Sequence, residues 1–211
     1  PLELEYLSID EKKLLRDKYN IPINKTVLVY GGNLGKPQGV DFIIDCIKEN
    51  ENRNDTYFLI IGSGTEYSRL ENYIESNIIQ NTSIHSFMPK EDYDKVVKAC
   101  DIGLVFLDKR FTIPNIPSRI LSYMEIGMPI IAATDKNTDL DRILLKGEFG
   151  LWSESGNIEA FYKNVDILSK DKKLIYDMGY KGRKYLDENY TSRHSYQQII
   201  KHFKNDIKNI I

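Results

Sequence analysis

Four unbroken apolar runs recur along the chain, and a segment of helical periodicity follows each of them. The runs cover residues 26–30, 57–61, 102–107 and 129–133, and shorter strands are expected at 83–87 and 150–152. None of the runs alternates polar with apolar residues, which is typical of strands buried on both faces. The sequence therefore predicts an α/β fold, a Rossmann-like parallel sheet with helices on both faces.

Helical segments account for most of the remaining chain. Those between the strands are expected at residues 40–48, 66–78, 90–99, 138–146 and 158–169. From residue 171 onward the pattern is helical, with a break near 189–191. Near the start, Ser8 and Glu11 have the spacing of a capping box, so a helix is expected to begin there.

Three segments follow from this pattern. Residues 1–24 are expected to form a linker with an N-terminal helix, residues 25–190 the Rossmann-like domain, and residues 191–211 a C-terminal helical tail. No internal repeat or low-complexity tract divides the domain. Because the chain begins at Pro1 rather than at Met, an upstream part of the protein is expected.

Composition excludes several classes of function. The net charge of the 211 residues is −2, so no overall positive charge would recruit nucleic acid or an anionic membrane. Cys46 and Cys100 lie far apart in apolar surroundings, which favours free thiols in a reducing compartment. No apolar run reaches the roughly 18 residues of a membrane span, and no signal peptide is visible. We therefore expect a cytoplasmic protein.

Metal binding is also not expected. Asp135, Asp139 and Asp141 lie close enough in sequence to suggest a cluster of ligands, but the segment TDKNTDLD fits helix caps better. The three histidines are scattered, and neither a zinc spacing nor a Ser-His-Asp arrangement is present.

Ligands of open parallel sheets bind beyond the carboxyl ends of the strands, near a change in strand order. Residues 31–39, GGNLGKPQG, follow the first strand and match neither a P-loop nor a dinucleotide fingerprint. Their glycines nevertheless permit close backbone approach, and Lys36 adds a positive charge, so a ligand loop is favoured over a simple turn. The second loop, residues 62–64 (GSG), fits a structural turn and a ligand contact equally well.

Residues 114–132, PNIPSRILSYMEIGMPIIA, form the third loop, a short helix and a strand. Pro117 is a good helix start, and Arg119 lies beside the free N–H groups of the first turn. At about 100° per residue, Ser118, Ser122 and Glu125 form one polar stripe on an otherwise apolar helix. By periodicity alone the stripe faces either water or a ligand, and a solvated Arg119 is the simpler interpretation of that residue. After a glycine-looped parallel sheet, a ligand becomes the favoured interpretation of the stripe.

Four segments together resemble a known family: TVLVYGGNLGKPQGVDFII, FLIIGSGTEYSRL, KACDIGLVFL and PSRILSYMEIGMPIIA. They are similar to the carboxyl-terminal half of retaining glycosyltransferases of the group 1, family 4 type, which have the GT-B fold. The bacterial capsule and O-antigen transferases are the most similar branch. The resemblance implies a nucleotide-sugar donor, here a UDP-sugar, bound by this half without a required metal or cofactor.

The resemblance also implies partners outside the chain. An amino-terminal domain would bind a glycan or lipid-linked acceptor, and the final helix would pack toward that domain. The product would be a cell-surface polysaccharide such as a capsule. Membrane contact, at the inner face, would arise only through that other half.

The resemblance assigns roles to particular residues. The diphosphate would contact Gly32, Asn33, Lys36, Gln38 and Gly39, the nucleoside would approach Gly62 and Gly64, and ribose and diphosphate would face Ser118, Arg119, Ser122 and Glu125. Glu125, Arg119 and Lys36 are the expected catalytic residues. Arg119 and Lys36 would stabilise the departing diphosphate, which is an electrostatic task, and Glu125 would stand in for a glutamate of the family that contacts the ribose.

The chain departs from the family pattern at several of these positions. Pro114 and Ser122 stand where the family has two glutamates, and Glu125 lies one turn later on the same stripe, from where it is expected to replace the second. Asn33 and Gln38 stand where an arginine and a lysine usually flank the loop. A non-catalytic domain that binds a nucleotide-sugar or a partner protein is therefore an alternative. A UDP-sugar epimerase is a weaker one, because no acid and base pair is evident.

Overall fold

The computed structural model describes residues 4–113 and 115–208, with side chains described for all of these except 198 and 202–208. Its centre is a sheet whose neighbouring strands are all parallel, in the order β3-β2-β1-β4-β5-β6. The strands are β1 (Thr26–Gly31), β2 (Thr56–Ile61), β3 (Thr82–His85), β4 (Ile102–Phe106), β5 (Ile130–Thr134) and β6 (Gly150–Glu154). The order of the strands reverses between β1 and β4.

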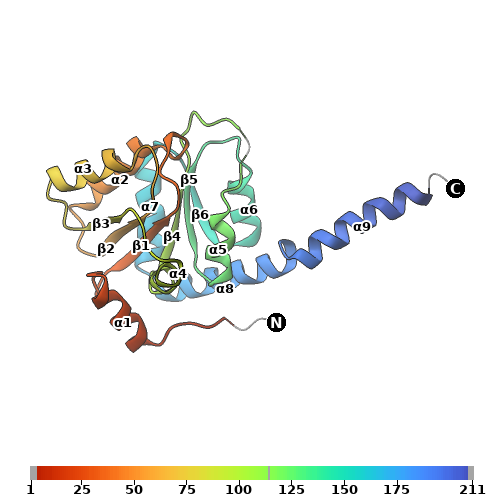
Figure 1. The fold of residues 1–211 in the computed structure, drawn as a ribbon, viewed down its shortest axis with the longest axis horizontal. Coiled ribbons are helices and arrows are strands. Elements are labelled where there is room, and N and C mark those ends of the chain that lie inside the picture. The colour runs from red at the N-terminus through yellow and green to blue at the C-terminus, as the bar shows by residue number, and fades with distance from the viewer. Residues whose placement is uncertain (1–3, 114, 209–211) are drawn as a thin grey trace.

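Helices cover both faces of this sheet (Figure 1). In chain order the helical elements are α1 (Ile9–Lys18), the 3₁₀ turn η1 (Lys36–Gln38), α2 (Val40–Asn50), α3 (Tyr67–Ser76), α4 (Lys90–Lys98), α5 (Arg119–Glu125), α6 (Leu140–Gly147), α7 (Ile158–Ser169), α8 (Lys172–Asn189) and α9 (Ser192–Lys208). The predicted fold class, a Rossmann-like parallel sheet between helices with a helical C-terminal region, is confirmed.

The two faces have separate apolar cores because successive strand residues point to opposite sides. Leu28 and Tyr30 of β1 pack against α2, α3 and α7, whereas Val27 and Val29 pack against α4, α5 and α6. The four central strands, β1, β2, β4 and β5, are almost completely buried, which explains why their sequences lack polar alternation.

The ends of the chain follow the expected pattern. Ser8 caps α1, and Glu11 completes the capping box, since its carboxylate accepts a hydrogen bond from the Ser8 backbone N–H at 2.8 Å. The expected break near 189–191 lies between α8 and α9. Figure 1 shows α9 extending away from the sheet and its helices. The domain boundaries at residues 24 and 190, and a role for α9 in contacting another domain, stay predictions.

Helix α8 approaches the rest of the domain through glycine. A Cβ on Gly179 would lie 1.9 Å from the carbonyl oxygen of Gly127, which is in the turn between α5 and β5. A Cβ on Gly182 would lie 3.1 Å from Cβ of Phe149. The contact between α8 and the end of α5 therefore requires a residue without a side chain at position 179.

Buried polar networks tie the helices to the amino edge of the sheet. Arg16 of α1 is 3% exposed, and its Nε donates to the Ala99 carbonyl at 2.9 Å. Its Nη2 lies 2.6 Å from the Asp101 carboxylate, which also accepts from the Val27 backbone N–H at 2.8 Å. Burial raises the pKa of Asp101, but Lys12 and Arg16 outweigh that effect and hold it below its usual value. This ion pair therefore joins α1 to the beginnings of β1 and β4.

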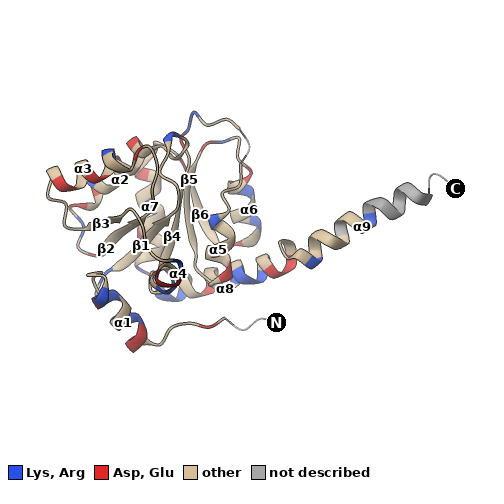
Figure 2. Cartoon of the chain, viewed as in Figure 1, with Lys and Arg blue, Asp and Glu red and all other residues tan. Residues whose placement is uncertain are grey.

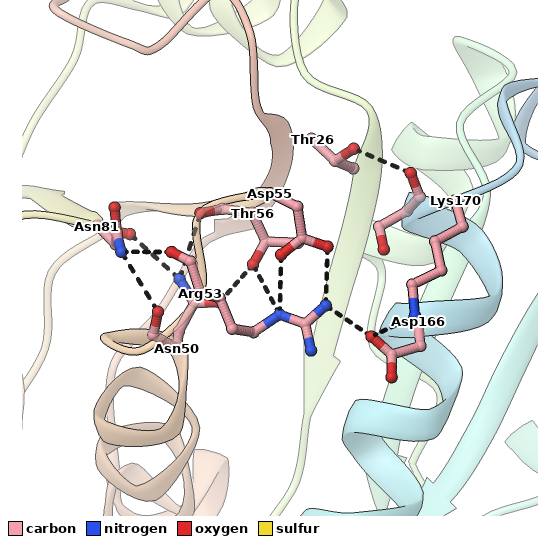
Figure 3. A network of polar contacts seen from close by, with 9 residues as sticks. Thr26, Asn50, Arg53, Asp55, Thr56, Asn81, Asp166 and Lys170 are labelled. Atoms are coloured by element: carbon pink, nitrogen blue, oxygen red, sulfur yellow. Dashed lines mark hydrogen bonds and ion pairs between the residues drawn. The ribbon is translucent and has the colours of Figure 1, made fainter.

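A second network lies at the same edge (Figure 3). The Arg53 guanidinium lies between Asp55 and Asp166 of α7, 2.6 Å from the latter. Asn81, just before β3, donates to the Arg53 carbonyl at 2.7 Å. The hydroxyl of the fully buried Thr56 donates to Asn50 at 2.6 Å. These contacts connect α2, α7, β2 and β3, so polar groups at this edge serve the fold.

Candidate functional site

The loops that follow β1 and β2 lie together at the opposite, carboxyl edge of the sheet. The Leu34 N–H donates to the Ser63 carbonyl at 2.8 Å, and the Glu66 N–H donates to the Leu34 carbonyl at 2.9 Å. A Cβ on Gly62 would lie 1.8 Å from the Gly32 carbonyl oxygen, and one on Gly64 would lie 2.4 Å from that of Leu34. Close packing of the two loops is therefore sufficient reason for both glycines of the second loop. Their contact with a nucleoside stays a prediction.

Side chains of the first loop hold its shape. The side-chain oxygen Oε1 of Gln38 accepts from the Gly35 N–H at 3.0 Å and from the side-chain amide of Asn33 at 3.3 Å. The Tyr30 hydroxyl donates to the Asn33 carbonyl. Gly39 has a φ of 65°, which favours glycine, and it begins α2 against the backbone of Asp108. Asn33 and Gln38 thus stabilise the loop, whatever else they contact.

Arg119, the first residue of α5, lies directly beneath this loop. Its guanidinium carbon is 4.2 Å from the centre of the Tyr30 ring, a cation–π distance. A Cβ on Gly32 would lie 3.1 Å from Nη2, so a side chain there would crowd the cation. Nη1 is buried, and no other described residue forms a hydrogen bond with it. A buried donor of a charged group without an acceptor is costly, and an acceptor supplied by an anionic ligand would relieve that cost.

Lys36 lies on the outer side of the first loop. It is exposed and lines a hollow of about 340 Å³ at the carboxyl edge together with Glu66, Arg69, Asp108 and Arg110. The structure therefore brings Lys36 to the same edge as Arg119 but on a different side of the loop. Its contact with a diphosphate stays a prediction.

A groove of about 600 Å³ runs between α4 and α5, within the size range of small-molecule sites. Ser122 and Glu125 of α5 line one wall, and Lys90 and Tyr93 of α4 line the other. The Tyr93 hydroxyl lies 1.9 Å from where a Cβ of Gly31 would be, so this wall of the groove packs against the first glycine loop. Two members of the polar stripe, Ser122 and Glu125, therefore face this groove, whereas Ser118 does not line it. That the stripe contacts a ligand stays a prediction.

The stripe extends over the whole helix, and its members lie at different distances from the loops. Ser118 is exposed at the start of α5. Glu125 is six residues after Arg119, about 9 Å further along the axis at 1.5 Å per residue. It lies next to α8, where Arg183 donates to the Glu125 carbonyl at 2.8 Å. The structure thus groups Arg119 with the glycine loops and places Glu125 at the far end of the groove. Pro114, expected at the first glutamate position, lies outside the described residues.

The sequence patterns do not mark several residues at this edge as candidate site residues. Tyr30 and Tyr123 were counted only as apolar, yet Tyr30 supports the Arg119 guanidinium and Tyr123 lies beside Gly31. His85 ends β3 with a buried Nε2 that has no hydrogen-bond partner in the part of the chain described, and burial lowers its pKa. Tyr30 and His85 each lie at the carboxyl end of a strand, where ligands of parallel sheets bind. That position in the sequence is the signal that could have marked them as candidate site residues.

The aspartates after β5 do not form a metal site. Asp135 accepts from the Asn137 N–H at 2.7 Å and from the Thr138 N–H at 3.1 Å, so it closes a turn. Asp139 precedes α6, but its side chain makes no capping bond and instead contacts Arg142. Within residues 4–113 and 115–208, no group of three or more His, Cys, Asp or Glu side chains is placed to hold a metal ion.

Charge and hydropathy add two observations. Basic and acidic residues are interspersed along α8 and along the helices around the sheet (Figure 2). Among the helices of the described residues, none is both long enough and apolar enough to cross a bilayer.

These features define a Rossmann-like α/β domain whose candidate ligand crevice lies where the strand order reverses. Residues 11–185 match the family model described as "Glycosyl transferases group 1", and the chain belongs to this family. The resemblance inferred from the sequence motifs is thereby confirmed.

The chain is similar to WcaI of Escherichia coli K12, named for a glycosyl transferase of colanic acid biosynthesis, with 25% identity over 61% of the chain. The chain spans about a third of that relative's length, 31%. Among solved structures, Anabaena HepE with UDP and glucose superposes at a TM-score of 0.76 and 17% identity, over 95% of this chain and 54% of HepE.

A third similarity concerns a single domain. The C-terminal domain of the group 1 family protein LpcC of Francisella tularensis superposes at a TM-score of 0.69 and 20% identity, covering 90% of this chain and 97% of that domain. The chain thus has the fold of the carboxyl-terminal half of a GT-B protein.

Proposed function

We propose that this chain is the donor-binding half of a retaining glycosyltransferase that uses a UDP-sugar. The observation that carries the proposal is the guanidinium of Arg119 beneath Gly32, with its buried Nη1 unpaired among the described side chains. A diphosphate seated on the first glycine loop would supply the missing acceptor. The structure of HepE with UDP and glucose, which has the same fold, supports this choice of ligand.

The chemistry needed from this half is electrostatic. When the bond between the sugar and the diphosphate breaks, negative charge develops on the departing phosphate oxygens. Arg119 and Lys36 would stabilise that charge, and donors positioned in advance for such a task reduce the barrier by about 3–4 kcal/mol each. No nucleophile from this half and no metal or other cofactor are required in this proposal.

The nucleoside would occupy the groove between α4 and α5, whose lining residue Tyr93 also contacts the start of the first loop at Gly31. Ser122 faces the groove one turn below Arg119 and would offer its hydroxyl to the ribose. Glu125 lines the far end of the same groove, and its predicted contact with the donor is retained as a hypothesis to be tested separately.

Titration calorimetry of the chain with UDP, GDP and a UDP-N-acetylhexosamine tests the proposal. We expect UDP to bind more tightly than GDP, and the Arg119→Ala variant to lose most of the affinity. Arg142→Ala is a matched control, because that arginine is 81% exposed on α6 and pairs only with Asp139 among the described residues. Absence of nucleotide binding at millimolar concentration would contradict the donor-binding role.

The rest of the reaction is assigned to a domain outside this chain. That domain would bind the acceptor, a glycan or a lipid-linked glycan of a cell-surface polysaccharide such as a capsule, in the cytoplasm or at the inner face of the membrane. Helix α9, which extends away from the sheet, would pack against it. A transfer assay with the full-length protein, with and without a chelator, tests the activity and the independence from metal.

A second candidate function is donor binding without transfer. Ser122 favours it, because a hydroxyl stands where the family has a carboxylate, at the wall of the groove. In that case the full-length protein would bind UDP but neither transfer nor hydrolyse the sugar. Restoring the carboxylate with Ser122→Glu would then raise the UDP affinity and create activity, whereas an active wild-type protein excludes this alternative.

A further inference from the structure

The sheet opens between β1 and β4 at its carboxyl end. The ladder between these strands consists of two register pairs, Leu28 with Ile102 and Val29 with Gly103. By contrast, β1 stays paired with β2 as far as Gly31. Beyond Val29, β1 therefore has backbone groups on its β4 side that need other partners.

The hydroxyl of Tyr123 supplies those partners. Tyr123 is 1% exposed in the middle of α5. Its hydroxyl accepts a hydrogen bond from the Gly31 N–H at 3.2 Å and donates one to the Val29 carbonyl at 3.1 Å. One hydroxyl thus takes the place that the backbone of a neighbouring strand would occupy in a continued ladder.

The ring of Tyr123 packs directly against Gly103, in the space that a side chain there would need. A Cβ at position 103 would be 2.4 Å from Cδ2 of the ring. The ring therefore packs against β4 while the hydroxyl binds β1, so one side chain spans the point where the strand order reverses. Burial also raises the pKa of Tyr123, which keeps the hydroxyl protonated and able to donate at neutral pH.

Arg119 is four residues before Tyr123, one helical turn away on the same face of α5. Whatever fixes Tyr123 against β1 also fixes where the guanidinium lies relative to Gly32 and Tyr30. We propose that Tyr123 is a positioning residue for the donor site, holding α5 at the distance from β1 that places Arg119 beneath the first glycine loop. This inference rests on the proposed function, because it names the residue that aligns the diphosphate-binding cation.

The experiment compares UDP affinity of the chain in four forms: wild type, Tyr123→Phe, Tyr162→Phe and Arg119→Ala. Tyr162 is the matched control, because its buried hydroxyl donates to the Cys46 carbonyl on the other face of the sheet. We expect Tyr123→Phe to weaken UDP binding by about fivefold or more, the scale of one ordinary hydrogen bond, because a displaced Arg119 keeps part of its contact with the diphosphate. Both variants should lose folding stability, because each removes a buried hydroxyl. Tyr162→Phe should nevertheless keep the wild-type affinity for UDP.

A double variant separates positioning from general destabilisation. If Tyr123 acts through Arg119, adding Tyr123→Phe to Arg119→Ala leaves the affinity of Arg119→Ala unchanged. Losses that multiply in the double variant, or a wild-type affinity in Tyr123→Phe, would overturn the inference.

Failure of the proposed function would be visible separately, as failure of the wild-type chain to bind UDP. In that case NMR of the free chain decides the inference. Tyr123→Phe should speed hydrogen exchange of the Gly31 amide and shift the side-chain Nε signal of Arg119. If both signals match those of the wild type, Tyr123 does not position Arg119.

Discussion

Two arginines lie at opposite edges of the same sheet, and their surroundings differ in kind. Arg16, at the amino edge, donates to the Ala99 and Lys25 carbonyls at 2.9 and 3.0 Å and to Asp101 at 2.6 Å. Arg119, at the carboxyl edge, rests on the Tyr30 ring and has a buried Nη1 without a partner in the described chain. Both guanidinium groups are partly or largely buried. Each nitrogen of the Arg16 guanidinium donates a hydrogen bond to the protein, whereas Nη1 of Arg119 donates none to a described residue.

The difference shows how the two edges divide their tasks. A buried charge whose donors are all paired stabilises the fold, and its removal leaves the partner uncompensated. A charge with an unpaired donor is costly to the empty protein, and that cost is recovered when an anion binds. Stability is therefore expected to depend on the amino edge and ligand binding on the carboxyl edge.

The largest expected effect is on folding. Arg16→Ala should lower the free energy of unfolding by about 3 kcal/mol, because it leaves Asp101 with Lys12 as its remaining cation and removes the donor of the Ala99 and Lys25 carbonyls. Urea unfolding followed by circular dichroism measures the loss, with Arg142→Ala as the exposed control. UDP affinity of the molecules that remain folded should be unchanged. A stability loss equal to that of the control would show that the pair at the amino edge is dispensable.

Arg119→Ala should give the opposite result. We expect UDP affinity to fall by about 1.5–3 kcal/mol, roughly 10- to 150-fold, as for loss of a hydrogen bond to a charged group. Folding stability should stay the same or rise, since an unpaired buried donor is removed. The same two measurements, calorimetry and urea unfolding, apply. A variant that unfolds more easily but binds UDP normally would reverse the assignment of the two edges.

Acid should affect the amino edge first. The pKa of Asp101 is lowered in the folded state, so its contribution is fully present above its unfolded value near 3.8 and is lost as pH falls through the lower folded value. Unfolding midpoints in urea between about pH 6 and pH 2 should therefore drop most steeply below pH 4. Asp101→Asn should flatten this part of the profile, because the side chain no longer titrates. Equal slopes in the two proteins would mean that Asp101 is not a principal acid-sensitive group.

The smallest effects concern the polar stripe of α5. Ser122→Ala should weaken UDP binding by about 1 kcal/mol, the usual net contribution of one hydrogen bond. Glu125→Ala should cost less than about 0.5 kcal/mol, because the residue lies next to α8 rather than next to the loops. A loss of about 1–3 kcal/mol for Glu125→Ala would instead support the ribose contact expected from the sequence.

Sequence patterns predicted the parts of the molecule that local physics decides. The apolar run at 26–30 became β1 with one added residue, and the capping box at Ser8 formed as expected. The position of Arg119 at the start of α5 also followed from local signals. Ser122 and Glu125 of the polar stripe on the same helix face a groove, because a parallel sheet directs such loops and helices to its carboxyl edge.

What sequence could not supply is the pairing of distant groups. The Tyr123 hydroxyl and the Val29 carbonyl are 94 residues apart, and no periodicity links a buried tyrosine to the strand it will bind. Likewise, the loop glycines at 62 and 64 read equally well as a turn or as a ligand contact until their packing against the first loop was visible. The separation of Glu125 from the loops depended on the direction of α5 within the fold.

The glycine contact of α8 governs more than local packing. Gly179 lies against the carbonyl of Gly127, and α9 follows α8 and extends away from the sheet. Any side chain at position 179 would push α8 away from the end of α5. Because α9 lies further along the chain, a small change in the direction of α8 would displace the described end of α9 by a larger distance. The direction of the C-terminal helix therefore depends on Gly179, a residue without a side chain.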